Sequence, residues 1–144
     1  MDSQNNTNTE QNKKKLLIAE DNPVLGEMYK RRFELEGFEA RLVSNGIEVQ
    51  PTAAEYQPDL ILLDLMMPGA NGLSALEQIR KEPATHQLKV FVFSALDQAS
   101  DKDRAMRLGA NEYLVKSKDM LLDVIDRVKK EFGMPVVPRE DEEY

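Results

Sequence analysis

The sequence predicts an α/β fold in which five βα units, (βα)5, form a doubly wound parallel five-stranded sheet. Short apolar runs alternate with longer segments whose apolar residues recur at helical spacing. Such alternation is typical of parallel strands joined by helices that cover both faces of the sheet. In addition, four of the apolar runs end in polar residues, at the edge where parallel sheets bind ligands.

Five apolar runs are predicted to be strands. The third run is almost wholly apolar, which is typical of a strand buried on both faces. The expected strands span residues 15–19, 38–43, 59–63, 88–93 and 112–115.

The segments after these runs are predicted to be helices. Asn22 can cap the first helix, Pro23 lies in its first turn, and Gly37 is placed to end it. Pro51 interrupts the second helix, which is therefore expected to be short, kinked or late-starting. The expected helices span residues 22–36, 47–56, 72–81 and 98–108, with a last one marked by Leu121, Val124, Ile125, Val128 and Phe132.

Length and composition exclude several classes of protein. The 144 residues suit one domain, expected at 14–133 between a disordered segment 1–13 and an acidic tail 134–144. The chain has no cysteine and one histidine, which excludes disulfides and thiolate or multi-histidine metal sites. A net charge of −7 disfavours direct nucleic-acid binding. Without a membrane-length apolar stretch or a signal peptide, a cytoplasmic protein that does not insert into membranes is expected.

The polar residues at the strand ends are expected to share one pocket. They are three carboxylates, a hydroxyl and an ammonium, at Glu20, Asp21, Asp64, Ser94 and Lys116. This combination suits a divalent cation and a phosphoryl group. Each residue alone also has a plainer interpretation: acids favoured at a helix N-terminus, a strand-end hydroxyl, or a lysine that pairs with acids.

The segment DLMMPGANG, residues 64–72, resembles the phosphoacceptor loop of bacterial two-component response-regulator receiver domains. The acidic pair, this loop, Ser94-Ala95 and Lys116 fall in the order of that family, over about residues 14–132. The resemblance implies a flavodoxin-like fold with strand order 2-1-3-4-5. It also implies a stand-alone, chemotaxis-regulator-like protein, without a further output domain in this chain.

The resemblance further implies roles for individual residues. Asp64 is expected to take a phosphoryl group from the phosphohistidine of a sensor histidine kinase or a histidine phosphotransfer protein. Ser94, Lys116 and the Ala95 amide are expected to contact the phosphoryl oxygens. The implied Mg²⁺ ligands are the carboxylates of Glu20, Asp21 and Asp64 and the backbone carbonyl of Met66.

The same resemblance implies how the signal leaves the domain. Ser94 is expected to move towards the phosphoryl group, and Tyr113 to turn inward behind it. The face of the fourth helix, fifth strand and fifth helix then changes and contacts a downstream protein. Catalysis is limited to self-phosphorylation and autodephosphorylation, and the chain is expected to be a monomer or weak dimer.

Two departures from the family pattern are visible. Ser117 replaces the usual proline, so a trans bond is predicted after Lys116, since a cis bond before serine costs about 3 kcal/mol. Met66 and Leu96 flank the path of the hydrolytic water in this family, and neither can orient water by hydrogen bonding. Slow autodephosphorylation is therefore expected.

Two other classes of function stay open from the sequence. A phosphatase of the haloacid dehalogenase type also uses an aspartate nucleophile and Mg²⁺, but needs a second acid where this chain has Met66. A phosphorylation-independent adaptor would keep the fold for binding alone, although the complete polar set argues against it.

Overall fold

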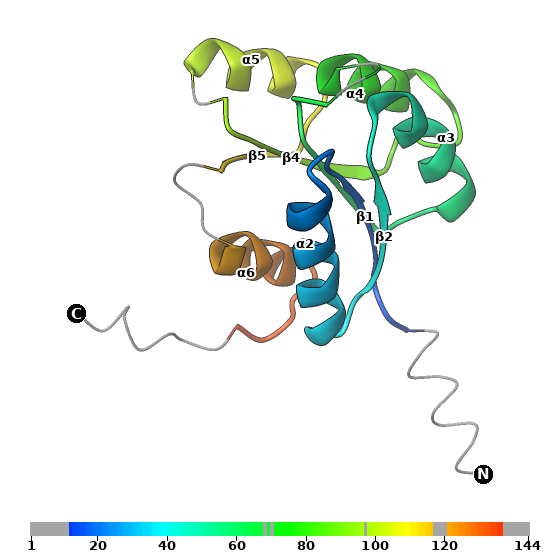
Figure 1. The fold of residues 1–144 in the computed structure, drawn as a ribbon. Helices are drawn as coiled ribbons and strands as arrows, with labels where there is room; N and C mark the ends of the chain where they lie inside the picture. The colour runs from blue at the N-terminus through cyan, green and yellow to red at the C-terminus, as the bar shows by residue number, and fades with distance from the viewer. Residues whose placement is uncertain (1–11, 68, 70, 97, 117–120, 137–144) are drawn as a thin grey trace.

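Five strands alternate with five helices along the chain in the computed structural model (Figure 1). The structure describes residues 12–67, 69, 71–96, 98–116 and 121–136. The predictions made for residues 1–11, for Ser117 and for the tail from 137 onward lie outside these residues. The elements are β1 (Lys15–Ala19), α2 (Pro23–Leu35), β2 (Glu39–Val43), α3 (Gly46–Tyr56), β3 (Leu60–Leu63), α4 (Gly72–Lys81), β4 (Lys89–Ser94), α5 (Ala99–Arg107), β5 (Glu112–Val115) and α6 (Leu121–Glu131).

The five strands form one parallel sheet in the order β2-β1-β3-β4-β5. This is the predicted doubly wound, flavodoxin-like topology. The order reverses between β1 and β3, where the chain first extends the sheet in one direction and then in the other. In such sheets ligands bind beyond the carboxyl ends of the strands at this reversal.

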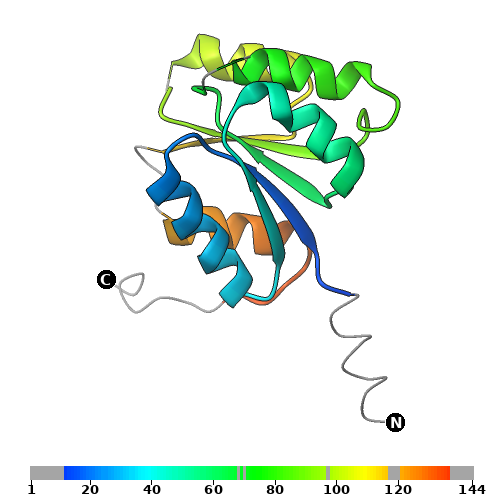
Figure 2. The same cartoon turned by 45° about the vertical axis from the view of Figure 1, so that its right-hand side comes forward.

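Helices cover both faces of the sheet, as Figures 1 and 2 show. Helices α2 and α6 pack on one face, and α3, α4 and α5 on the other. Strand β1 illustrates why, because alternate side chains point to opposite faces. Leu17 belongs to the core beneath α3 and α4, whereas Leu16 and Ile18 belong to the core beneath α2 and α6.

The first helix begins as predicted. The Asn22 side chain accepts hydrogen bonds from the Val24 and Leu25 amides, at 3.0 Å each, and Pro23 lies in the first turn. Met28 shares the helical spacing of the apolar residues in this segment, but it is 43% exposed. The helix buries Tyr29 and Phe33 instead, and Tyr29 meets the Phe93 ring edge-on with ring centroids 4.8 Å apart.

Pro51 neither shortens nor delays its helix, so the prediction of a short or late-starting helix is wrong. Helix α3 runs for 11 residues from Gly46, with Pro51 inside it. The Asn45 side chain caps the helix by accepting from the Glu48 amide at 3.1 Å. The fully buried Val49 and Ala53 lie on either side of Pro51, and their packing on the sheet outweighs the loss of one helical hydrogen bond.

None of the helices in the described part of the chain has the length and apolar character required to span a membrane.

Candidate functional site

The predicted strand-end residues lie together at the carboxyl edge of the sheet. Backbone pairing continues one residue beyond the strands: the Asp64 amide donates to the Ala19 carbonyl at 3.1 Å, and the Lys116 amide to the Ser94 carbonyl at 2.8 Å. This pairing brings Asp64 beside the end of β1 and Lys116 beside the end of β4. Glu20, Asp64 and Ser94 are at most 3% exposed.

The Lys116 ammonium joins the two buried acids. Its Nζ lies 2.9 and 3.1 Å from the two carboxylate oxygens of Glu20 and 3.0 Å from Asp64 Oδ2. It also lies 4.7 Å from the centre of the Phe93 ring, within cation–π distance. A single point charge with three donors thus satisfies acids from two different strands.

Burial and hydrogen bonding shift the pKa values of Glu20 and Lys116. Burial, together with a hydrogen bond to Asp64, raises the pKa of Glu20 to about 7, although Lys116 opposes the shift. Burial also disfavours the Lys116 ammonium, but its hydrogen bonds to Glu20 and Asp64 prevail and raise the pKa of Lys116. The lysine therefore stays charged, and the pocket is short of positive charge.

Three carboxylates in this pocket are arranged to hold a metal ion. One oxygen from each of Glu20, Asp21 and Asp64 can be chosen so that all lie within 4.8 Å of one another. Asp21 is exposed, so the cluster opens to solvent on that side and an ion could keep water ligands. Among the described residues, these acids fit Mg²⁺, which prefers oxygen ligands. Met66 is placed beside them, and its amide donates to Asp64 Oδ1 at 3.0 Å.

Gly72 holds the loop that follows Asp64, a role that sequence reasoning missed. Its amide donates to the Leu65 carbonyl at 3.0 Å. A Cβ atom at this position would stand 2.4 Å from Leu65 Cα and 2.6 Å from the Asp64 carbonyl oxygen, so only glycine allows this approach. The signal in the sequence was a glycine at the first position of an expected helix, where no turn requires one.

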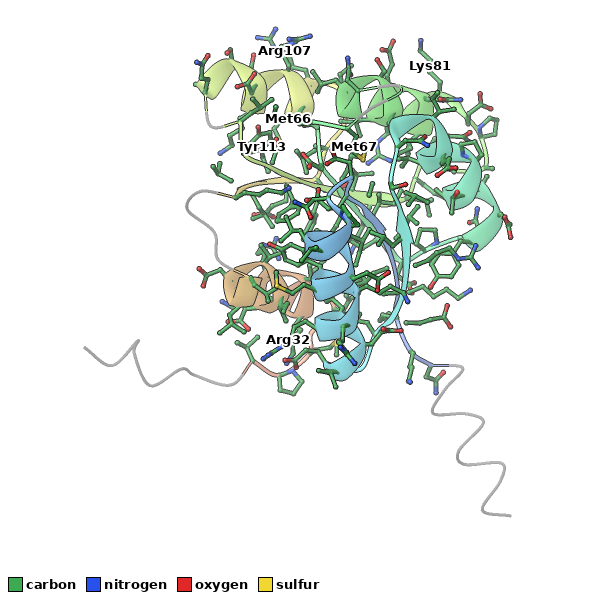
Figure 3. All side chains as sticks on the ribbon, in the orientation of Figure 1. Arg32, Met66, Met67, Lys81, Arg107 and Tyr113 are labelled. Carbon is green, nitrogen blue, oxygen red and sulfur yellow. The ribbon has the colours of Figure 1, made fainter. Side chains whose placement is uncertain are left out.

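Ser94, Leu96 and Tyr113 form a second connected group beside the acids. Ser94 is fully buried and its Oγ accepts from the Leu96 amide at 3.3 Å, while the exposed Ala95 lies between them. The Tyr113 hydroxyl donates to the Leu96 carbonyl at 2.6 Å, with the ring already turned inward and 9% exposed. In Figure 3 the labelled Met66 and Tyr113 both lie on the side of the sheet that faces α4 and α5.

Residues 16–126 match the family described as the response regulator receiver domain. The chain belongs to this family. Receiver domains bind Mg²⁺ at an acidic pocket and interact with histidine kinases or phosphotransfer proteins, so the cluster of Glu20, Asp21 and Asp64 is where that pocket is expected.

Relatives of this receiver domain include both short and long proteins. It is 36% identical to protein PilH of Pseudomonas aeruginosa, with 79% of this chain and 96% of PilH covered. It is 33% identical to the DNA-binding dual master transcriptional regulator RpaA of Synechocystis, with 74% of this chain and 44% of RpaA covered. The chain therefore spans about half the length of several curated relatives that it matches.

Solved structures of other proteins share the fold of this chain. The receiver domain of sensor histidine kinase PA1611 from Pseudomonas aeruginosa has a TM-score of 0.75 and 25% identity, covering 84% of this chain and 98% of that one. That structure is described as having a magnesium ion coordinated in its active site cleft.

Proposed function

We propose that this receiver domain accepts a phosphoryl group on the Asp64 carboxylate from the phosphohistidine of a histidine kinase or a histidine phosphotransfer protein. The observation that carries the proposal is the position of Asp64, buried at the carboxyl edge with Lys116 at 3.0 Å and two further acids beside it. A buried aspartate with only a structural role would need a cation partner, but it would not need two further acids beside it.

The transfer exchanges one bond to phosphorus for another. An Asp64 oxygen bonds to phosphorus as the phosphorus–nitrogen bond to the histidine breaks, and the ring nitrogen keeps that electron pair. The Lys116 ammonium neutralises charge on the transferring group, which is the main contribution that a protein makes to this chemistry. Ser94 and the Ala95 amide are the proposed donors to the remaining phosphoryl oxygens.

The proposed Mg²⁺ ligands are the carboxylates of Glu20, Asp21 and Asp64 and the backbone carbonyl of Met66. When bound, the ion supplies the positive charge that the metal-free pocket lacks. Because Lys116 contacts both Glu20 and Asp64, these acids must share their oxygens between the ammonium and the ion.

The signal is proposed to leave through Ser94 and Tyr113. A phosphoryl oxygen that draws the Ser94 hydroxyl changes its contact with the Leu96 amide, and Leu96 is bonded to Tyr113 through its carbonyl. Tyr113 belongs to β5, so the change reaches the face of α5, β5 and α6, where a downstream protein would bind.

The chain is further proposed to act as a single-domain regulator, folded over residues 14–133 and cytoplasmic, as a monomer or weak dimer. The likeness to PilH supports this assignment, because the match covers 96% of that protein. Its proposed catalysis is confined to its own phosphorylation and dephosphorylation.

The decisive experiment is the intact mass of the protein after incubation with acetyl phosphate and Mg²⁺. One added phosphoryl group is expected, and it should be absent without Mg²⁺ and in Asp64→Asn. The matched control is Asp103→Asn, an exposed aspartate on α5, which should be labelled like the parent. Absence of an adduct, together with failure to bind beryllofluoride, would overturn the proposal in favour of a phosphorylation-independent adaptor.

A further inference from the structure

Met66 is an exposed methionine in the loop that follows the proposed phosphoacceptor. Its side chain is 55% exposed, whereas its neighbours Leu65 and Met67 are 5% and 8% exposed and belong to the core beneath α3 and α4. Figure 3 labels both methionines. Because the residues on both sides are held in that core, the Met66 side chain is directed to solvent. The loop thus exposes one thioether and buries the next.

The loop also holds Met66 at the solvent side of the acidic pocket. The Met66 amide donates to Asp64 Oδ1 at 3.0 Å, and the Gly72 amide fastens the preceding residue by donating to the Leu65 carbonyl at 3.0 Å. Asp64 is 3% exposed, so water must reach its carboxylate past the exposed residues around it, and Met66 is one of these. A polar group on this side chain would therefore act on water that enters the pocket.

Methionine is the side chain of this protein that a mild oxidant attacks first. The chain has seven methionines and no cysteine, so no thiol competes for the oxidant. A peroxide transfers one oxygen atom to the thioether sulfur. The peroxide O–O bond breaks, the sulfur–oxygen bond forms, and hydrogen peroxide is reduced to water while the sulfur is oxidised. The product is a polar methionine sulfoxide, which reductases return to the thioether.

We propose that Met66 is an oxidation site at which a peroxide shortens the lifetime of phosphorylated Asp64. A thioether sulfur is a weak hydrogen-bond acceptor, whereas a sulfoxide is polar and its oxygen accepts hydrogen bonds. Hydrolysis requires a water aligned with phosphorus. The sulfoxide oxygen holds that water by accepting a hydrogen bond from it. The water oxygen then bonds to phosphorus as the bond to the Asp64 oxygen breaks, which releases phosphate, a free carboxylate and a proton to solvent.

The inference rests on the proposed phosphorylation of Asp64 and adds control of the phosphorylated state by oxidation. The position of Met66 sets it apart from the other described methionines with known exposure. Met28 and Met106 are 43% and 41% exposed, but they lie within helices α2 and α5 rather than in the loop after Asp64. Met67 lies in that loop, but it is buried, so a sulfoxide there would disturb the core instead of the pocket.

The first measurement identifies the methionines that react. The full-length protein is treated with a limited amount of hydrogen peroxide and digested, and fragment masses distinguish Met66 from Met67. Met66 should react at least as fast as Met28 and Met106, and well before Met67, because its thioether is the most exposed of the four. A Met66 thioether that stays intact while Met28 and Met106 react would overturn the proposal.

The second measurement is the decay of the phosphorylated protein. Protein with most of its Met66 oxidised is freed of peroxide and labelled with acetyl phosphate and Mg²⁺, and its intact mass is followed after the phosphodonor is removed. Decay should be about threefold faster than in untreated protein. Met66→Gln, which places an amide oxygen on a side chain of similar length, should decay faster without peroxide. Equal decay of treated and untreated protein would overturn the proposal.

The matched controls are Met66→Leu and Met106→Leu, each measured with and without peroxide. Both remove one exposed thioether, but only Met66→Leu should abolish the effect of peroxide on decay. Met106→Leu should keep it. Treatment of the oxidised parent with a methionine sulfoxide reductase should return decay to the untreated rate. Acceleration by peroxide in Met66→Leu would assign the effect to another side chain and overturn the proposal.

Untreated protein separates failure of this inference from failure of the proposed function. If untreated protein takes no phosphoryl group on Asp64, the proposed function is wrong and the inference fails with it. If untreated protein is labelled normally and peroxide leaves the decay unchanged, the inference alone is wrong.

Discussion

Lys116 and Glu20 are 96 residues apart in the sequence, yet the lysine ammonium lies 2.9 and 3.1 Å from the two carboxylate oxygens of the glutamate. The same ammonium reaches Asp64 at 3.0 Å. Glu20 and Asp64 belong to the ends of β1 and β3, the two strands between which the strand order reverses. One lysine that follows the edge strand β5 thus contacts both acids at the centre of the proposed site.

Replacing this lysine should destabilise the protein, and Mg²⁺ should reduce the effect. Lys116→Met leaves two buried carboxylates without a cation, for which a loss of about 3 kcal/mol in the free energy of unfolding is expected. Because the acids are then free to bind Mg²⁺, the ion should restore part of that loss through linkage to the folded state. Urea denaturation with and without Mg²⁺ measures both effects.

Lys129→Met is the matched control for this prediction. Lys129 is also largely buried and pairs with one acid, Glu36, away from the pocket. The free energy of unfolding should fall less in Lys129→Met than in Lys116→Met, and Mg²⁺ should not change that loss. If Mg²⁺ stabilised the Lys129 and Lys116 variants equally, the proposed competition between ammonium and ion would be wrong.

The fold could be predicted because each element carries its own local signal. Apolar runs mark the strands, and the N-cap residues Asn22, Asn45 and Asn71 mark the starts of three helices. These local signals leave little freedom in where the elements begin. Pro51 was misread because the cost of a helical proline, one lost hydrogen bond and a local clash, was considered without the packing around it. Here the packing of Val49 and Ala53 on the sheet, which the sequence does not show, decides the outcome.

The members of the site were predictable, but their contacts were not. Parallel strands bring their carboxyl ends to one edge, so Glu20, Asp64 and Lys116 had to be neighbours. The Lys116 ammonium contacts both acids because of the rotamers of the three side chains. No spacing in the sequence reveals these rotamers. The exposure of Met28 was likewise hidden, because a helical pattern identifies a face without showing how far the neighbouring elements cover it.

Gly72→Ala should disturb the proposed phosphoacceptor loop. The added Cβ meets backbone atoms of Leu65 and Asp64 at 2.4 and 2.6 Å, and backbone cannot move aside as a flexible side chain can. Overpacking of this kind costs about 1–3 kcal/mol, and the shift of Asp64 should also slow labelling by acetyl phosphate. Thermal denaturation and the rate of mass change measure the two effects.

Gly26→Ala provides the comparison for Gly72→Ala. Gly26 lies inside α2, and a Cβ there meets only the side chain of Leu42, at 3.0 Å. Labelling of Asp64 should therefore proceed at the parent rate in this variant. Normal labelling of Gly72→Ala as well would show that the loop tolerates the displacement.

Tyr113→Phe should uncouple the output face from the proposed phosphorylation site. The change removes the hydroxyl that donates to the Leu96 carbonyl at 2.6 Å, at a cost of about 1 kcal/mol in stability. The amide shifts of α5, β5 and α6 on beryllofluoride binding should shrink, while the rate of labelling on Asp64 stays near that of the parent.

Tyr56→Phe is closely matched to Tyr113→Phe. Tyr56 is 7% exposed against 9% for Tyr113, and its hydroxyl also makes a 2.6 Å hydrogen bond, to Glu39. Both variants should lose similar stability, but only Tyr113→Phe should alter the response to beryllofluoride. An equal response to beryllofluoride in the two variants would show that Tyr113 does not transmit the signal.

Decay of the phosphorylated protein should be slow, and two substitutions should accelerate it. Met66 is 55% exposed and Leu96 is half-buried, one on each side of the Asp64 and Ser94 pocket, and neither side chain can hydrogen-bond to water. Met66→Asn with Leu96→Glu supplies an amide and a carboxylate that can orient a water towards phosphorus. We expect decay about tenfold faster, equivalent to a barrier lower by about 1.4 kcal/mol.

The intact-mass signal after removal of the phosphodonor measures the decay. The control is Met106→Asn, at a 41% exposed methionine on α5, which should leave the decay unchanged. Unchanged or slower decay in the double variant would show that these two side chains do not limit hydrolysis.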